Sequence, residues 1–157
     1  MKFKPLLVSS VFAALFALVG GFLTKLDEWY YSLKQPFWKP PDLAFGPVWT
    51  IIFILCAMSA ATCYEKAKED RNYQIKTINV FIFNGILNST WSFFYFYLKR
   101  PDVALLEVVF LWGSIIILIL HAKKVSNLSA ILLIPYLSWV SLAGVLNYQT
   151  VILNSLN

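Results

Sequence analysis

Five long apolar runs dominate the chain and restrict it to a membrane-embedded fold. They lie at about residues 5–23, 45–64, 76–98, 102–122 and 128–153. Each run has roughly the 20 residues that a helix needs to cross the hydrocarbon core of a bilayer. Of the 157 residues, 59% are hydrophobic and only 13% are charged, whereas about a quarter of the residues in a soluble domain are charged. The sequence therefore predicts an all-α protein, a five-transmembrane-helix bundle that forms a single membrane domain over residues 1–157.

The first apolar run admits two interpretations. Its basic start, apolar stretch and small residues are typical of a signal peptide. Against cleavage, the run is long enough to span a bilayer, and no A-x-A site precedes a polar segment. We expect the run to be retained as the first helix.

Small residues recur every four positions along this first helix. Ser9, Ala13, Ala17 and Gly21 share one face, and such a face lets another backbone approach closely. The partner is either another helix of the same bundle or a second subunit. The sequence leaves both alternatives open.

The connection after the first helix is aromatic and rich in proline. The stretch from Trp29 to Trp49 contains three Trp and four Pro. Proline at this density is incompatible with a regular helix, because each ring removes an N–H and restricts the preceding residue. Trp and Tyr nevertheless bury large areas. We therefore expect an extended, stiff loop that packs over the mouth of the bundle.

Polar side chains lie inside two of the predicted spans. Asn84, Asn88 and Trp91 share one stripe of the third helix, and Glu107 lies about two turns inside the fourth. Polar groups are costly in a membrane interior unless they are paired. They either hydrogen-bond between helices or provide polar contacts inside a ligand cavity, and both roles are compatible.

The fifth predicted helix contains Pro135 well inside its span. The ring should kink the helix, and Trp139, Ala143 and either Leu146 or Asn147 follow on the same face. A kink with a Trp one turn beyond it can shape a pocket wall. Because consecutive helices run in opposite directions, this half of the helix should share a side of the membrane with the aromatic loop.

The sequence offers little for conventional catalysis or metal binding. Cys56 and Cys63 are seven residues apart on one predicted helix, roughly 10 Å, which is too far for a disulfide. With a single histidine, His121, and no Cys/His cluster, we expect neither a metal site nor a bound cofactor. The cations sit at helix ends rather than in a stripe, so we expect no nucleic-acid partner.

Several motifs, taken together and in order, resemble the translocator protein family, which includes the bacterial tryptophan-rich sensory proteins (TspO) and the mitochondrial peripheral benzodiazepine receptors. The motifs are Trp29-Tyr30, Leu33-Lys34-x-Pro36-x-Trp38-x-Pro40-Pro41, Gly46-Pro47-Val48-Trp49, Asn88 with Trp91, Glu107, Pro135-Tyr136-Leu137-x-Trp139 and Leu146-Asn147-Tyr148. The resemblance covers practically the whole chain.

The resemblance implies a five-helix membrane protein, usually a homodimer, with a hydrophobic pocket under the loop between helices 1 and 2. Members bind porphyrins such as protoporphyrin IX, sterols in animals, and synthetic isoquinoline carboxamides and benzodiazepines. Some bacterial members are credited with light-dependent breakdown of protoporphyrin, in which Trp29 and Trp139 would be the reactive residues. We expect the ligand-binding residues to be Trp29, Tyr30, Pro41, Phe45, Trp49, Phe53, Asn84, Asn88, Trp91, Glu107, Trp139, Ala143, Leu146 and Asn147.

We therefore expect a membrane receptor or sensor for tetrapyrroles and similar hydrophobic ligands. Porphyrin photodegradation is the main alternative, and transmembrane transport of tetrapyrroles is another; a conventional enzyme is not expected. The N-terminal side of the predicted bundle has eight Lys or Arg and the opposite side has five. The positive-inside rule then predicts a cytoplasmic N-terminus, in what we expect to be a bacterial cell membrane.

Overall fold

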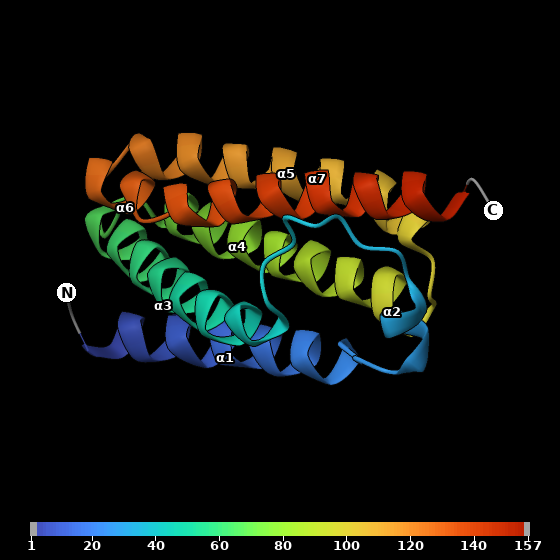
Figure 1. The fold of residues 1–157 in the computed structure, drawn as a ribbon. Coiled ribbons are helices and arrows are strands. Elements are labelled where there is room, and N and C mark those ends of the chain that lie inside the picture. Colours follow the sequence, from blue (N-terminus) through green and yellow to red (C-terminus); the bar gives the residue numbers. More distant parts are fainter. Residues whose placement is uncertain (1–2, 156–157) are drawn as a thin grey trace.

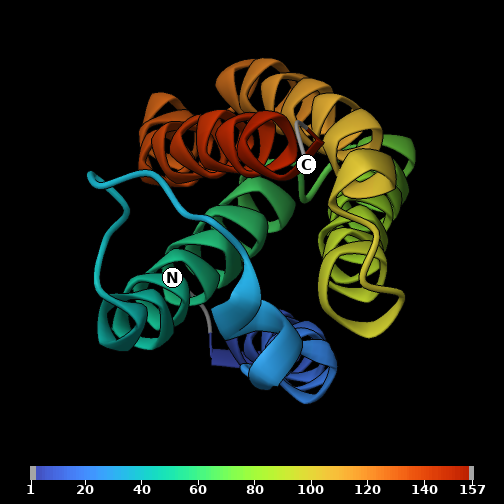
Figure 2. The ribbon, with the colours of Figure 1, turned by 45° about the vertical axis from the view of Figure 1, so that its right-hand side comes forward.

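The computed structural model describes residues 3–155, and in this part of the chain every regular element is a helix. The elements in chain order are α1 (Phe3–Leu23), α2 (Glu28–Ser32), α3 (Asp42–Lys66), α4 (Arg71–Ser92), the π-helix η1 (Phe93–Tyr97), α5 (Pro101–Lys123), α6 (Asn127–Ile131) and α7 (Ile134–Ser155). The long helices lie side by side in one bundle (Figures 1 and 2). α1 begins at the opposite end of the bundle from the end of α7 (Figure 1). The predicted all-α fold is confirmed.

Four helical segments are long and apolar enough to cross a membrane: Phe3–Leu23, Asp42–Lys66, Pro101–Lys123 and Asn127–Ser155. They coincide with four of the five predicted spans. The third predicted span corresponds to α4 and η1, which are long enough but carry more polar residues.

The connection between α3 and α4 is shorter than predicted. The predicted apolar runs end at residue 64 and resume at residue 76, but α3 continues to Lys66 and α4 begins at Arg71. Asp70 caps α4, because its side chain accepts a hydrogen bond of 2.9 Å from the backbone N–H of Tyr73. At its other end α4 passes into η1, where five aromatic residues follow one another in the sequence.

The segment that joins α1 to α3, residues 24–41, is here called the lid segment. The expectation of an extended loop is wrong for its first half, because Glu28–Ser32 form the short helix α2. Asp27 caps this helix by accepting a hydrogen bond from the N–H of Tyr30. The prolines begin only at Pro36, so nothing prevents a helical turn before that position, and residues 33–41 contain no helix.

The expected kink at Pro135 is instead a break between two helices. α6 ends at Ile131 and α7 begins at Ile134. Pro135 therefore lies in the first turn of α7, where the missing N–H would have had no intrahelical partner. The prediction of a proline well inside one continuous helix is wrong.

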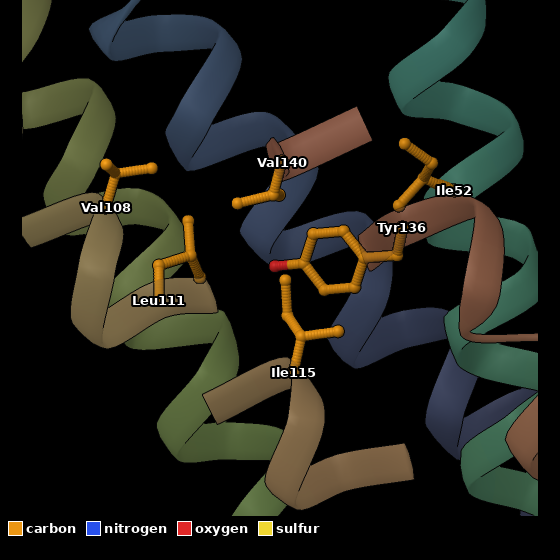
Figure 3. Close-up of a cluster of buried hydrophobic side chains, with 6 residues drawn as sticks. All are labelled: Ile52, Val108, Leu111, Ile115, Tyr136 and Val140. Carbon is orange, nitrogen blue, oxygen red and sulfur yellow. The ribbon is translucent and has the colours of Figure 1, made fainter. Parts of the chain in front are cut away.

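A cluster of buried side chains holds α3, α5 and α7 together (Figure 3). Its members are Ile52, Val108, Leu111, Ile115, Tyr136 and Val140. Outside the bundle many large apolar side chains are exposed, among them Leu106 and Phe110 at 69% each. Exposed apolar surface on this scale is expected of a protein whose solvent is lipid.

Candidate functional site

A cavity of about 430 Å³ lies beneath the lid segment, between α1, α3, α4 and α7. We call it the lid cavity. Its lining residues are Ala17, Gly20, Gly21, Thr24, Leu26, Tyr30, Asp42, Phe45, Gly46, Trp49, Thr50, Phe53, Asn88, Trp91, Ser92, Phe96, Trp139 and Ala143. The lid segment and the three helices α1, α3 and α4 contribute most of this surface.

The wall of the lid cavity is aromatic. Phe45 and Trp139 meet edge to face with ring centroids 5.4 Å apart, and Trp49 lies 5.8 Å from Phe53. The Nε1 atom of Trp139 is buried and has no hydrogen-bond partner among residues 3–155. Trp139 thus lines the cavity with its ring, whereas its unpaired N–H is buried and not exposed to the cavity.

Two asparagines hold aromatic residues of this region in place. Asn147 accepts a hydrogen bond of 3.2 Å from Nε1 of Trp91, and its Nδ2 donates to the carbonyl of Pro101 at 2.8 Å. Asn88 donates through Nδ2 to the hydroxyl of Tyr136 at 3.2 Å. The buried amides therefore take part in hydrogen bonds between helices, which is one of the two roles that the sequence left open.

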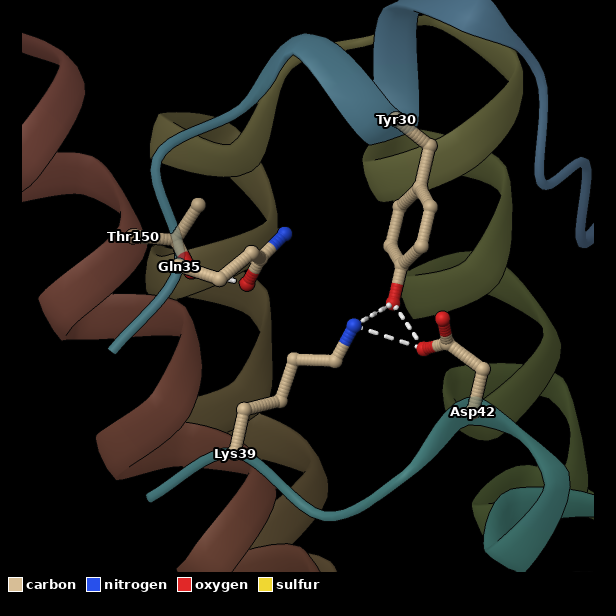
Figure 4. Close-up of polar contacts among 5 residues, drawn as sticks. All are labelled: Tyr30, Gln35, Lys39, Asp42 and Thr150. Carbon is tan, nitrogen blue, oxygen red and sulfur yellow. Dashed lines mark hydrogen bonds and ion pairs between the residues drawn. The ribbon is translucent and has the colours of Figure 1, made fainter. Parts of the chain in front are cut away.

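A phenol, an ammonium and a carboxylate converge beside the lid cavity (Figure 4). The hydroxyl of Tyr30 donates to Oδ1 of Asp42 at 2.7 Å, and Nζ of Lys39 lies 2.6 Å from the same oxygen and 2.8 Å from the hydroxyl. Burial, together with the carboxylate of Asp42, raises the pKa of Tyr30. We call these three residues the lid triad.

The lid segment is also attached to α7. Asn154 accepts a hydrogen bond from the backbone N–H of Lys34 and donates one to its carbonyl, at 3.1 and 3.0 Å. Thr150 donates to the side chain of Gln35 at 3.3 Å (Figure 4). The lid segment therefore bridges α3 and α7, two helices that border the lid cavity.

Eight of the fourteen ligand-binding residues expected from the sequence line the lid cavity. They are Tyr30, Phe45, Trp49, Phe53, Asn88, Trp91, Trp139 and Ala143.

The other six lie elsewhere. Pro41 caps α3, and Leu146 is half-buried on α7 next to Asn147, whose amide supports Trp91. Trp29 packs on Tyr95 with ring centroids 6.3 Å apart, outside the lining of the lid cavity. Glu107 is buried in α5, and neither carboxyl oxygen has a hydrogen-bond partner among the described residues. The sixth, Asn84, lines a different cavity.

This second cavity, of about 320 Å³, lies between α1, α3 and α4, and we call it the α1–α4 cavity. Its lining residues are Lys4, Pro5, Val8, Ser9, Phe12, Ala13, Phe16, Ile52, Phe53, Cys56, Ala57, Ala60, Tyr64, Thr77, Ile78, Phe81, Ile82, Asn84, Gly85, Asn88 and Tyr136. Only Phe53 and Asn88 also line the lid cavity.

The two cavities show what the small residues of α1 face. Ser9 and Ala13 line the α1–α4 cavity, and Ala17 and Gly21 line the lid cavity. The stripe therefore points into the protomer and leaves space there. The spacing of the small residues was the available signal, but spacing alone does not distinguish free space from close packing.

The comparisons with known proteins agree with this architecture. The model of the TspO/MBR family matches residues 8–153. The chain is 36% identical over 134 residues to the tryptophan-rich protein TspO of Chlorobaculum tepidum, covering 85% of this chain and 84% of that protein. It is 35% identical over 155 residues to the uncharacterized membrane protein YtaB of Bacillus subtilis, covering 94% of each chain.

A more distant relative is the translocator protein of Bos taurus, which is 26% identical over 151 residues, covering 92% of this chain and 89% of that protein. The match of the family model extends from within α1 to near the end of α7 and includes the lid segment, all of the lid-cavity lining and all of the α1–α4 cavity lining except Lys4 and Pro5. The chain is an integral membrane protein and belongs to the TspO/MBR family.

Proposed function

We propose that this protein is a membrane receptor that binds a tetrapyrrole such as protoporphyrin IX in the lid cavity. The observation that carries the proposal is the aromatic wall of that cavity, which includes Trp49, Trp91 and Trp139. A flat apolar macrocycle favours aromatic faces, a few polar contacts and a cover that excludes water. The volume of about 430 Å³ lies in the usual range for small-molecule sites.

The lid triad supports an acidic ligand. Tyr30 and Asp42 line the cavity, and Lys39 is bonded to both. A propionate of the macrocycle could replace the Asp42 carboxylate beside the Lys39 ammonium, because both present the same acceptor group. The triad would then hold the lid segment closed without ligand and hold the ligand's acidic edge when it is bound.

Two titrations test this proposal with a matched control. Protoporphyrin IX is added to the purified protein in detergent, and quenching of Trp fluorescence is followed. Trp49→Ala should weaken binding by roughly 1–3 kcal/mol, the range for losing a buried contact. The control is Trp112→Ala, because Trp112 lies on α5, is 41% exposed and does not line the cavity. Equal affinities in the two variants would exclude the lid cavity as the site.

Light-dependent degradation of the porphyrin is the second candidate function. The favouring observation is that three indoles, which are readily oxidised, line the same cavity. Of the two residues that the resemblance suggests, Trp139 lines the cavity whereas Trp29 packs against Tyr95. Under illumination with oxygen, bound porphyrin should bleach faster than porphyrin in empty micelles, and removing oxygen should slow this bleaching. Trp139→Phe should slow that bleaching more than Trp29→Phe. Equal bleaching of free and bound porphyrin would refute the degradation function and leave the receptor function as the proposal.

We also propose that α4 and η1 form a fifth membrane span. Polar residues of α4, including Asn84 and Asn88, are buried inside the bundle, whereas Ile75, Phe83 and Ile86 are 43–56% exposed. A mean hydropathy taken over the whole helix combines these two faces and underestimates the apolar surface that would contact lipid.

The orientation proposed from the charge bias is a cytoplasmic N-terminus, in a bacterial cell membrane. A cysteine at position 69, in a chain from which Cys56 and Cys63 have been removed, should be protected from an impermeant thiol reagent in intact cells. A cysteine at position 37 should react, because Phe37 is fully exposed in the lid segment. The reverse pattern would invert the topology.

The family resemblance also leads us to propose a homodimer. No residue of α1 is buried within the protomer, and Leu15 and Leu18 are 52% and 70% exposed. This surface would meet either lipid or a second copy. Sedimentation in density-matched detergent distinguishes these outcomes, and a monomer at all protein concentrations would refute the dimer.

A further inference from the structure

The α1–α4 cavity lies outside the lid site and has a distinct chemical pattern. Its body is apolar and is formed by side chains such as Val8, Phe12, Ile78 and Ile82. Among the described residues that line it, Lys4 alone carries a full charge. The cavity therefore combines a long apolar surface with one cation at one end.

The groups beside Lys4 make this end polar. Tyr64 and Thr77 line the cavity, and the Tyr64 hydroxyl accepts a hydrogen bond of 3.4 Å from Arg71. Thr77 is held by the carbonyl of Tyr73 and by Nε2 of His121, each within 2.9 Å. Arg71 is thus a second cation near this end, although it does not line the cavity. The two hydroxyl-bearing residues lie between the apolar interior and the polar surface.

The inner end lies at Phe16. Its ring rests directly on Gly85, where a Cβ would come within 2.4 Å of a ring atom. Along α1 the lining of this cavity ends at Phe16, and the lining of the lid cavity begins at Ala17. From Lys4 to Phe16 the helix rises about 18 Å, the length of a long acyl chain.

We propose that the α1–α4 cavity binds a long-chain fatty acid, with the carboxylate at Lys4 and the chain running along α1 toward Phe16. A carboxylate is the complement of a single ammonium at one end of an otherwise apolar cavity. The cavity volume of about 320 Å³ suits one acyl chain rather than the two chains and headgroup of a phospholipid. This site goes beyond the proposed function, because its ligand and its lining differ from those of the lid cavity.

Photolabelling of the full-length protein in detergent tests the proposal. The probe is palmitic acid with a diazirine near its methyl end, and labelled peptides are mapped by mass spectrometry. Label is expected on α1 near Phe16 and on α4 near Ile82 and Gly85, and excess oleate should abolish it. Label spread over the outer surface of α5, around Phe110, and insensitive to oleate would overturn the proposal.

Two variants of the chain sharpen this test. Lys4→Glu should reduce the labelling about fivefold or more, the value of one charged contact. Lys25→Glu, at the other end of α1, is the matched control and should leave it unchanged. Ala13→Phe should fill the cavity and also reduce labelling. Porphyrin titration of each variant monitors the fold and the lid site independently, and undiminished labelling in both Lys4→Glu and Ala13→Phe would refute the site.

Two further probes fix the chemistry of the ligand. Hexadecanol with the same diazirine should label these positions more weakly than the acid, because it lacks the carboxylate. A phosphatidylglycerol with the diazirine in one chain should not compete effectively. Equal labelling by the alcohol, or stronger labelling by the phospholipid, would contradict a fatty-acid site.

Discussion

Asn147→Leu is expected to destabilise the bundle through Trp91, although Asn147 does not itself line the lid cavity. Asn147 is 1% exposed, and its amide joins Nε1 of Trp91 to the carbonyl of Pro101. Leucine has a similar size but can make neither hydrogen bond. The N–H of the half-buried Trp91 indole would then lose this partner.

The magnitude follows from these two contacts. Leaving a buried donor unsatisfied costs about 1–3 kcal/mol, whereas hydrogen bonds between membrane helices average about 0.6 kcal/mol. The carbonyl of Pro101 lies in the first turn of α5 and retains access to a helical N–H donor, so the loss at Trp91 dominates. We expect a decrease of about 1–3 kcal/mol in the free energy of unfolding.

Reversible unfolding in mixed micelles, followed by far-UV circular dichroism as SDS is added, measures this value. Asn79→Leu is the control, because Asn79 is exposed on α4, and it should not lose stability. In a Trp91→Phe background, which lacks the indole N–H, Asn147→Leu should cost about 1 kcal/mol less. Equal costs in both backgrounds would refute the role assigned to the Trp91–Asn147 bond.

Three further perturbations test other contacts. Gly85→Ala should cost about 1–3 kcal/mol in the thermal unfolding of the protein, because its Cβ would overlap the ring of Phe16, and Phe16→Leu should reduce that cost; an unchanged cost would contradict the contact. Glu107→Leu should not destabilise, because it replaces a buried carboxyl without a partner, and a loss above about 1 kcal/mol would contradict this. The pKa of Tyr30 is raised in the folded protein. Its stabilising contribution is therefore complete below the pKa of about 10 in the unfolded chain and is lost as pH rises toward the folded-state pKa. Between pH 9 and pH 11 the wild type should lose more thermal stability than Tyr30→Phe.

Hydropathy was sufficient to predict the helical fold, and local capping decided the details that it missed. Asp70 starts α4 earlier than the apolar run suggested, and Asp27 allows a helical turn in the lid segment. Pro135 starts a helix rather than bending one. Each difference depends on one side chain or one proline ring at a helix end. Hydropathy averaged over about 20 residues does not detect such a local effect.

The sequence pattern identified residues that line the lid cavity, but it did not separate them from residues that pack against the lining. Trp49 and Trp139 line the cavity. Asn147, which we expect to contact ligand, accepts a hydrogen bond from Trp91 and does not line the lid cavity, and Trp29 packs on Tyr95. The spacing along a helix identifies a shared face, but it does not identify which neighbouring helix that face meets.

The free space inside the bundle follows from one large side chain among small ones. Ala13 and Ala17 would allow α1 to approach its neighbours closely, but the ring of Phe16 stands between them and rests on Gly85. Because a glycine is required for that contact, α1 cannot move closer to α4 without displacing an aromatic ring. We infer that Phe16 holds α1 at a distance from α4 and that the small residues on either side of it consequently line cavities, one toward Lys4 and one beneath the lid segment.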